Sequence, residues 1–182
     1  IAGATDQGIK EAMIDPSDTA IHQEQLPDEA ATVAFAKRLA RLAAPGDVFA
    51  LFGDLGAGKT ALARAFINAL PDEFGQPCAE EVPSPTFTLV QQYQRKPGLV
   101  WHFDLYRIEE AEEVWELDFE DALASGISLI EWPERLAGLL PTTALRILLE
   151  VAPSTSAPAG RRISLYGAGT WNDRWASLDE RA

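Results

Sequence analysis

Apolar residues recur at helical spacing in some stretches of the chain and form short continuous runs in others. Residues 27–44 repeat apolar side chains every three or four positions and precede Pro45-Gly46, which predicts a helix that ends there. Residues 47–52 (DVFALF) form a continuous apolar run, typical of a strand buried on both faces of a parallel sheet. The glycine-rich residues 53–58 then lead into a helical pattern over 59–70. The predicted order is helix, strand, glycine loop, helix.

The middle of the chain predicts a loop, two strands, one or two short helices and a further strand. Residues 72–85 lack periodicity and predict a long surface loop. Residues 86–93 and 99–106 alternate like strands, and a turn containing Pro and Gly separates them. An apolar stripe within 108–124 predicts one or two short helices, and 127–130 is again an apolar strand.

Toward the end of the chain, 145–151 and 162–166 predict two strands that pair antiparallel across a Ser/Pro/Ala-rich loop. A last helix is predicted to begin near Thr170. Residues 1–12 precede the only methionine and lack periodicity, so we expect a leader, either artificial or disordered, ahead of a single domain over 13–182.

Composition narrows the class of protein. The 182 residues include 28 acidic and 15 Lys or Arg side chains, for a net charge of −13, so this chain is a poor candidate for holding nucleic acid without a partner. Cys78 has no partner for an internal disulfide, and His22 and His102 are too few for a His/Cys zinc cage. No apolar run predicts a membrane span or a signal peptide, and we expect a cytoplasmic protein.

The most informative motif is Gly53-Asp54-Leu55-Gly56-Ala57-Gly58-Lys59-Thr60, which matches G-x-x-x-x-G-K-[ST]. In such a P-loop, backbone N–H groups surround phosphate oxygens, the lysine reaches the β- and γ-phosphates and the hydroxyl binds Mg²⁺. A chance match is the alternative, but the motif lies between a predicted buried strand and a predicted helix. The sequence therefore predicts nucleotide binding in a three-layer α/β P-loop fold with a mainly parallel sheet and added antiparallel strands.

Two acidic residues at strand ends are candidates for a metal site beside the P-loop. Asp104 ends the strand WHFD and shares its more polar face with His102 and Tyr106, while Glu131 directly follows ISLI. Asp104 could instead cap the next turn. Glu131 could orient the attacking water, complete the metal shell or pair with a nearby arginine. His102 fits a satisfied sheet histidine better than a catalyst.

The loop Ser84-Pro85-Thr86 has the position of a switch segment that senses the γ-phosphate. Thr86 would offer its hydroxyl to phosphate or Mg²⁺, or would be an ordinary first residue of a strand. Residues 109–121 contain eight acids and no base, which favours a solvated helix face. The alternative is docking on a basic partner, with Trp115 and Phe119 as anchors.

The prediction of ATP over GTP rests on the absence of a guanine-reading sequence. None of the lysines is followed two places later by Asp, as in the guanine-reading sequence of Ras-like GTPases, and this favours ATP. A small-molecule kinase is the weaker alternative, because Arg161-Arg162 lies far along the chain and the loop over 72–85 is acidic. A third possibility is a nucleotide-gated assembly module in which hydrolysis is incidental.

Four separated strings, GDLGAGKT, SPTFTL, HFDLYR and GISLIEWPERL, together resemble the TsaE (YjeE) family of bacterial P-loop ATPases. The resemblance covers about Leu26 to Leu149. It implies an ATPase that supports TsaD and TsaB in forming threonylcarbamoyladenosine on tRNA, at the adenosine beside the anticodon, without transferring the threonylcarbamoyl group itself. It also implies that tRNA is met mainly through these partners.

Carried over by position, the resemblance implies catalytic roles for Lys59, Thr86 and Glu131 and a Mg²⁺ site formed by Thr60, Asp104 and Glu131. ATP would be held by the P-loop and its neighbours, namely Asp54, Leu55, Gly56, Ala57, Gly58, Lys59, Thr60, Ala61 and Trp132. The departures from the family pattern lie in the N-terminal extension and in the loop over 153–160.

Overall fold

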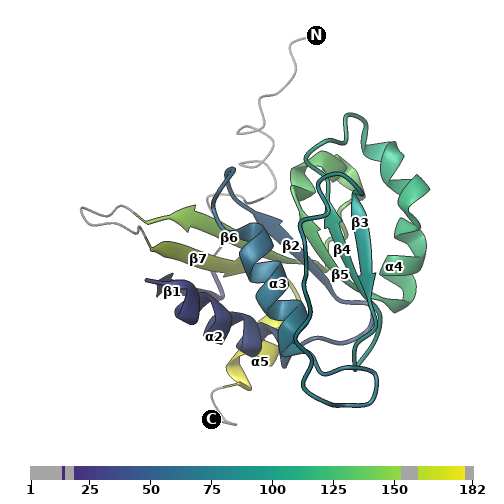
Figure 1. Ribbon diagram of the computed structural model, residues 1–182. Coiled ribbons are helices and arrows are strands. Elements are labelled where there is room, and N and C mark those ends of the chain that lie inside the picture. Colours follow the sequence, from purple (N-terminus) through teal and green to yellow (C-terminus); the bar gives the residue numbers. More distant parts are fainter. Residues whose placement is uncertain (1–13, 15–18, 153–159, 179–182) are drawn as a thin grey trace.

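The computed structural model describes residues 14, 19–152 and 160–178, and Figure 1 shows their arrangement. They form one seven-stranded sheet in the order β1-β7-β6-β2-β5-β4-β3. The four central neighbours β6, β2, β5 and β4 run parallel, whereas β1, β7 and β3 are added antiparallel. This confirms the predicted α/β class with a mainly parallel centre. The expectation for residues 1–12 lies outside the described residues.

The strands have short and well-defined bounds. They are β1 (His22–Leu26), β2 (Val48–Phe52), β3 (Val90–Tyr93), β4 (Val100–Asp104), β5 (Ile127–Glu131), β6 (Leu145–Val151) and β7 (Arg161–Tyr166). Every residue of β2, β4 and β5 is buried, as expected of central parallel strands that are covered on both faces. The predicted antiparallel pair of β6 and β7 is also present.

The helices are α2 (Glu29–Ala40), α3 (Lys59–Ala69), α4 (Phe119–Ser125) and α5 (Trp171–Ala176), with 3-10 segments η1 (Ala111–Leu117) and η2 (Pro133–Leu139). Helix α2 begins at Asp28, whose side chain accepts a hydrogen bond from the Ala31 N–H group (2.8 Å). Helices α2, α3 and α5 share one apolar core with one face of the sheet. The segments η1, α4 and η2 share a second core on the opposite face. The sheet is therefore the middle of three layers.

The structure differs from the sequence prediction in three elements. Strand β1 was not predicted because its sequence HQEQL is polar, and its conformation comes from antiparallel pairing with β7. The predicted strand over 86–93 begins only at Val90, since Leu89 has φ 66° and its N–H group bonds to the Pro85 carbonyl (2.6 Å). Segment η2 was also not predicted. None of the helices in the described ranges is both long and apolar enough to span a membrane.

The packing of Phe49 in the core predicts a large effect of its removal on the free energy of unfolding. Phe49 of β2 is fully buried and its ring packs on Phe66 and Trp171 at centroid distances of 5.0 and 5.5 Å. We expect Phe49→Ala to lower the free energy of unfolding by about 3–5 kcal/mol through loss of burial and a residual cavity. Phe87→Ala is the matched control: this side chain is 86% exposed, and the expected change stays within about 0.5 kcal/mol. Urea unfolding of both variants measures the difference, and equal losses would contradict it.

Candidate functional site

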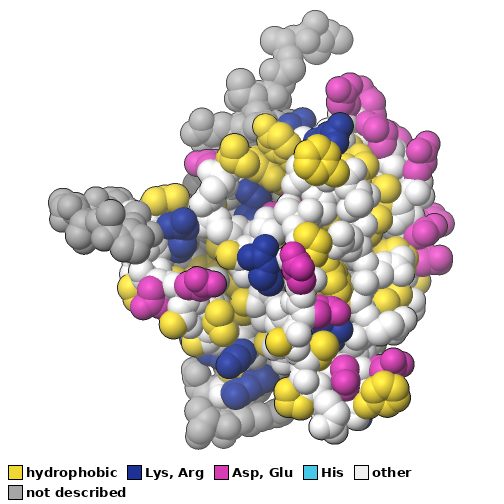
Figure 2. All heavy atoms as spheres, viewed as in Figure 1, with side chains coloured by type: hydrophobic (Ala, Val, Ile, Leu, Met, Phe, Trp, Pro, Cys, Tyr) yellow, Lys and Arg dark blue, Asp and Glu magenta, His cyan; other side chains and the backbone are white. Residues whose placement is uncertain are grey.

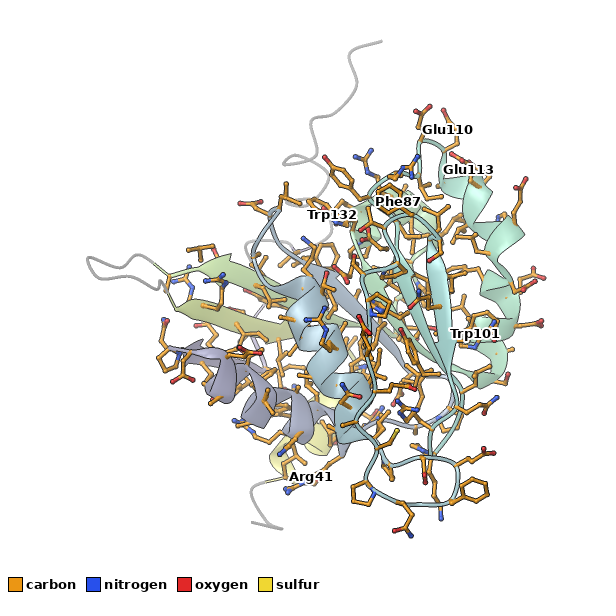
Figure 3. The ribbon with its side chains drawn as sticks, viewed as in Figure 1. Arg41, Phe87, Trp101, Glu110, Glu113 and Trp132 are labelled. Atoms are coloured by element: carbon orange, nitrogen blue, oxygen red, sulfur yellow. The ribbon has the colours of Figure 1, made fainter. Side chains whose placement is uncertain are left out.

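The predicted site residues meet at the edge of the sheet where the parallel strands end. The glycine loop follows β2 at this edge, and Asp104 and Glu131 are the last residues of β4 and β5. The loop leads into α3. This helix packs on the face of the sheet to which Leu51 of β2 and Leu129 of β5 point. Figure 3 shows Trp132 and Phe87 near the start of α3, at this end of the sheet.

The P-loop backbone is folded tightly and leaves the start of α3 open. Gly53 has φ 149°, and a Cβ atom there would lie 2.5 Å from the Leu149 carbonyl oxygen of β6, so only glycine fits. Gly58 precedes α3 with φ 107° and provides no side-chain cap. The first N–H groups of the helix therefore have no capping side chain, and they can serve an anion.

Lys59 turns back over its own loop. Its side chain is buried, and Nζ donates to the carbonyl oxygens of Gly53 (2.7 Å) and Asp54 (3.0 Å). Nζ also lies 3.7 Å from the centroid of the Trp132 ring, within the range of a cation–π interaction. The lysine charge is thus held beside the open N-terminus of α3.

Asp104 and Glu131 are placed side by side by the strand register. They are direct partners in the parallel pairing of β4 and β5, and both are almost fully buried. The Thr60 hydroxyl donates to Glu131 Oε2 (2.8 Å), which joins the P-loop helix to the neighbouring strand. Two adjacent buried carboxylates repel each other, so the pair favours a cation between or beside them.

The loop Ser84-Pro85-Thr86 reaches the same place from the other side. The Thr86 hydroxyl donates to Asp104 Oδ2 (2.5 Å), and the Ser84 hydroxyl lies 3.2 Å from the same oxygen. Thr86 is therefore not the first residue of a strand: it lies in the turn before β3. Both hydroxyls contact Asp104 here, and the role of this loop as a switch segment stays a prediction.

These groups surround a cavity of about 340 Å³. Every predicted site residue except Asp54 and Ala57 lines this cavity. The lining residues that the sequence predicted are Leu55, Gly56, Gly58, Lys59, Thr60, Ala61, Thr86, Asp104, Glu131 and Trp132. Asp54 is exposed, whereas Ala57 is buried in the core. A second cavity of about 620 Å³ lies between α2 and α3 and shares Gly58 and Ala61 with the first.

The donor set can accommodate Mg²⁺. Within the described ranges, no group of three or more His, Cys, Asp or Glu side chains is arranged to hold a metal. Mg²⁺ needs no such cage, because it keeps several waters and binds one or two carboxylates together with substrate phosphates. Asp104, Glu131 and the Thr60 hydroxyl supply oxygen ligands of this kind next to the open start of α3.

Tyr106 is a site residue that the sequence placed only on the polar face of its strand. Its backbone N–H group donates to Asp104 Oδ1 (3.1 Å), and its ring packs on Trp132 at a centroid distance of 4.9 Å. It lines the smaller cavity. The alternation with His102 and Asp104 was the available signal for this position.

Arg161 is a second residue whose role the sequence did not indicate. It begins β7, and its guanidinium donates to the carbonyl oxygens of Ala57 (2.7 Å) and Gly56 (3.2 Å). By bonding these carbonyls, Arg161 holds the P-loop backbone in place. Nothing in the sequence connects this position to a motif more than a hundred residues earlier.

The acidic segment after β4 is mainly a solvated face. Figure 2 shows acidic side chains along the edge of the molecule formed by this part of the chain. Trp115 is partly exposed, but Phe119 is fully buried against Phe103, at a centroid distance of 5.5 Å. The suggestion that Phe119 anchors a partner is therefore wrong, because its side chain belongs to the core.

A buried strand, a glycine loop with an uncapped helix behind it and a carboxylate pair define this chain as a P-loop α/β protein. The family described as "Threonylcarbamoyl adenosine biosynthesis protein TsaE" matches residues 26–162, and the chain belongs to this family.

Similar proteins agree with this assignment. The chain is 41% identical over 128 residues to the tRNA threonylcarbamoyladenosine biosynthesis protein TsaE of Rickettsia felis, covering 69% of this chain and 71% of that protein. It is 38% identical over 126 residues to TsaE of Bacillus subtilis, covering 69% and 74%. The crystal structure of Bacillus subtilis YdiB superposes with a TM-score of 0.62 at 28% identity, covering 88% of this chain and 92% of that one.

The hydrogen bonds from Arg161 to the P-loop predict that substitution of this residue weakens nucleotide binding. If the P-loop binds a nucleotide, we expect Arg161→Gln to weaken that binding by about tenfold, because hydrogen bonds from a charged donor contribute about 1.5–3 kcal/mol and here they hold the backbone of the loop. Arg162→Gln is the control, since the neighbouring side chain bonds to Glu150 instead. Calorimetric titration of both variants measures the two affinities. An equal effect of both changes would argue against a role in the P-loop.

Proposed function

We propose that this protein binds and hydrolyses ATP with Mg²⁺ and thereby supports a TsaD/TsaB complex in forming threonylcarbamoyladenosine on tRNA. The observation that carries the proposal is the hydrogen bond from Thr60 to Glu131, beside the register partner Asp104. It brings the P-loop hydroxyl and two strand-end carboxylates to one point. This is the arrangement that a Mg²⁺-nucleotide requires. Family membership supports the pathway.

The chain's own groups divide the work of binding. The N–H groups at the start of α3 hold phosphate oxygens, and Lys59 places its charge over the β- and γ-phosphates. Thr60, Asp104 and Glu131 would hold Mg²⁺, which neutralises charge on the phosphates when bound. Thr86 and Ser84 orient Asp104 through their hydroxyls. Trp132 and Tyr106 cover the pocket.

Hydrolysis needs a water in line with the bond from the γ-phosphorus to its bridging oxygen. The water oxygen bonds to phosphorus as that bond breaks, the electron pair of the broken bond stays on ADP, and the water gives up a proton to solvent, which leaves ADP, inorganic phosphate and a proton. Glu131 is the residue that we assign to orient the water, because its carboxylate lines the cavity and can accept a hydrogen bond from it, while Asp104, the other carboxylate there, is held by Ser84 and Thr86.

The isolated chain is expected to turn over slowly. Among the described residues that line the smaller cavity, Lys59 is the only Lys or Arg, so the chain presents no second cation to the transition state there. A partner protein would complete the site. The net charge of −13 fits a subunit that meets tRNA mainly through its partners, and the pathway implies a cytoplasmic location.

The larger cavity is the place for the nucleoside. It adjoins the phosphate site through Gly58 and Ala61, on the side away from Thr86 and Asp104. Its lining includes apolar side chains from β1, from both helices and from β6, namely Leu26, Val33, Ala61, Ala65 and Leu149. A planar base can pack between such groups.

Removal of the P-loop lysine tests the ATPase. We expect Lys59→Ala to lower ATP turnover by at least about 100-fold, since a charge that stabilises the transferred phosphoryl group is lost. Lys96→Ala is the control, because that lysine is exposed and lies outside both cavities. Phosphate release is measured with and without Mg²⁺, and with TsaB, TsaD and tRNA modification followed in the same reaction.

Three results would change the proposal. Unaltered turnover in Lys59→Ala would remove the ATPase assignment. A Glu131→Ala variant that no longer hydrolyses ATP but still supports tRNA modification would favour the nucleotide-gated module. Phosphate transferred to an acceptor in place of release would indicate a kinase.

Filling the larger cavity tests the nucleoside site. We expect Val33→Trp to weaken ATP binding at least about tenfold while inorganic triphosphate binds as before, because the indole occupies space needed by the base. Ala34→Trp places the same side chain at the next position of α2, which is exposed and outside the cavity. Equal affinities of the two variants for ATP would place the base elsewhere.

A further inference from the structure

His102 is a fully buried polar side chain with one side-chain hydrogen bond within the described residues. It lies in the middle of β4, two residues before Asp104 and on the same face of the sheet. Its Nε2 atom is 2.8 Å from Glu131 Oε1. The contact is diagonal across the parallel pair, since the register partner of His102 is Leu129. The imidazole therefore supports Glu131 from the interior of the protein.

The two oxygens of Glu131 have different partners. Oε2 accepts from the Thr60 hydroxyl on the cavity side, and Oε1 meets His102 on the buried side. A carboxylate held at one oxygen can still turn about its last torsion, whereas one held at both oxygens has a fixed plane. His102 and Thr60 together determine how Glu131 faces the cavity.

The second ring nitrogen shows which atom carries the hydrogen. Nδ1 of His102 is buried and has no hydrogen-bond partner within the described part of the chain. Burying an N–H group without an acceptor costs more free energy than burying a ring nitrogen that carries only a lone pair. A carboxylate oxygen accepts, so Nε2 is the atom that donates in the contact with Glu131. His102 thus aims its one hydrogen-bonded ring nitrogen at one carboxylate oxygen.

We propose that His102 is a positioning residue that sets the orientation of Glu131 for turnover. The proposal rests on the role of Glu131 in the proposed function. His102 lies outside the lining of the smaller cavity and acts only through the carboxylate. Partners of this kind, one shell away from a reactive or metal-binding group, typically change activity by about 10- to 100-fold when removed.

The first test observes the contact in the chain without nucleotide. Nitrogen-15 NMR of the histidine rings should show one ring with a hydrogen on Nε2 that exchanges slowly with water, and this signal should change in Glu131→Gln. The sequence contains only His22 and His102, so His22→Gln assigns the two rings. A His102 ring without a hydrogen on Nε2, or an unchanged signal in Glu131→Gln, would overturn the proposal.

The second test compares two substitutions that differ in where they place a donor. The side-chain amide of Gln reaches the position of Nε2, whereas that of Asn reaches only that of Nδ1. We expect His102→Asn to lower kcat about 10- to 100-fold with little change in KM. His102→Gln should restore most of it. An equal loss of kcat in both variants would mean that His102 has a structural role in the sheet and does not position Glu131.

A double-mutant cycle separates positioning from general destabilisation. In the Glu131→Gln background, His102→Asn should lower kcat no further, because both changes remove the same oriented group. Ser128→Ala is the structural control: Ser128 is buried in β5 on the opposite face of the sheet, and its hydroxyl has no hydrogen-bond partner among the described residues. This control should leave kcat near the unsubstituted value.

The outcomes distinguish the inference from the proposed function. If Glu131→Gln lowers turnover but His102→Asn does not, or if the two losses multiply, the inference fails and the proposed function stands. If Glu131→Gln leaves turnover unchanged, the role of Glu131 in the proposed function fails and the inference falls with it.

Discussion

The site depends on the register between β4 and β5. Parallel pairing sets Asp104 opposite Glu131 at the ends of two fully buried strands, and the pleat turns both side chains to the same face. Two carboxylates at adjacent, largely buried positions repel each other when both are ionised. The surrounding groups offset this repulsion with donors: Thr60 and His102 to Glu131, and Thr86 and the Tyr106 N–H group to Asp104. If the register of β4 against β5 shifted by one residue, one of the two carboxylates would point to the opposite face of the sheet, into the core formed with η1, α4 and η2.

The remainder of the site is organised around this pair. Helix α3 brings Thr60 to Glu131, and the turn before β3 brings Thr86 to Asp104, so the P-loop and the switch-like segment are linked through neighbouring strands. Lys59 is held by its own loop and by Trp132, the residue that follows Glu131. A change at one carboxylate therefore reaches both segments that would contact a nucleotide phosphate.

The sequence predicted those parts whose signal is local. The apolar runs of β2 and β5 and the glycine loop are such signals, and Asp104 and Glu131 were found because parallel strands end at one edge. Strand β1 escaped prediction because its polar sequence acquires a strand conformation only by pairing with β7. Arg161 and His102 escaped for a related reason: each acts on a residue distant in sequence, and no local pattern records such a contact. Trp115 and Phe119 share a stripe, yet the turn between η1 and α4 leaves the first partly exposed and buries the second.

The pairing of β1 with β7 has a consequence for how the molecule is assembled during synthesis. His22 is the partner of Leu165, so an element near the start of the described chain has no neighbour in the sheet until one of the last strands emerges. Arg161, which bonds to the Gly56 and Ala57 carbonyls, belongs to that same late strand. On the ribosome the glycine loop is made early, but this support arrives late. The backbone of the glycine loop therefore gains its contacts to Arg161 only when β7 joins the sheet, after most of the domain has been synthesised.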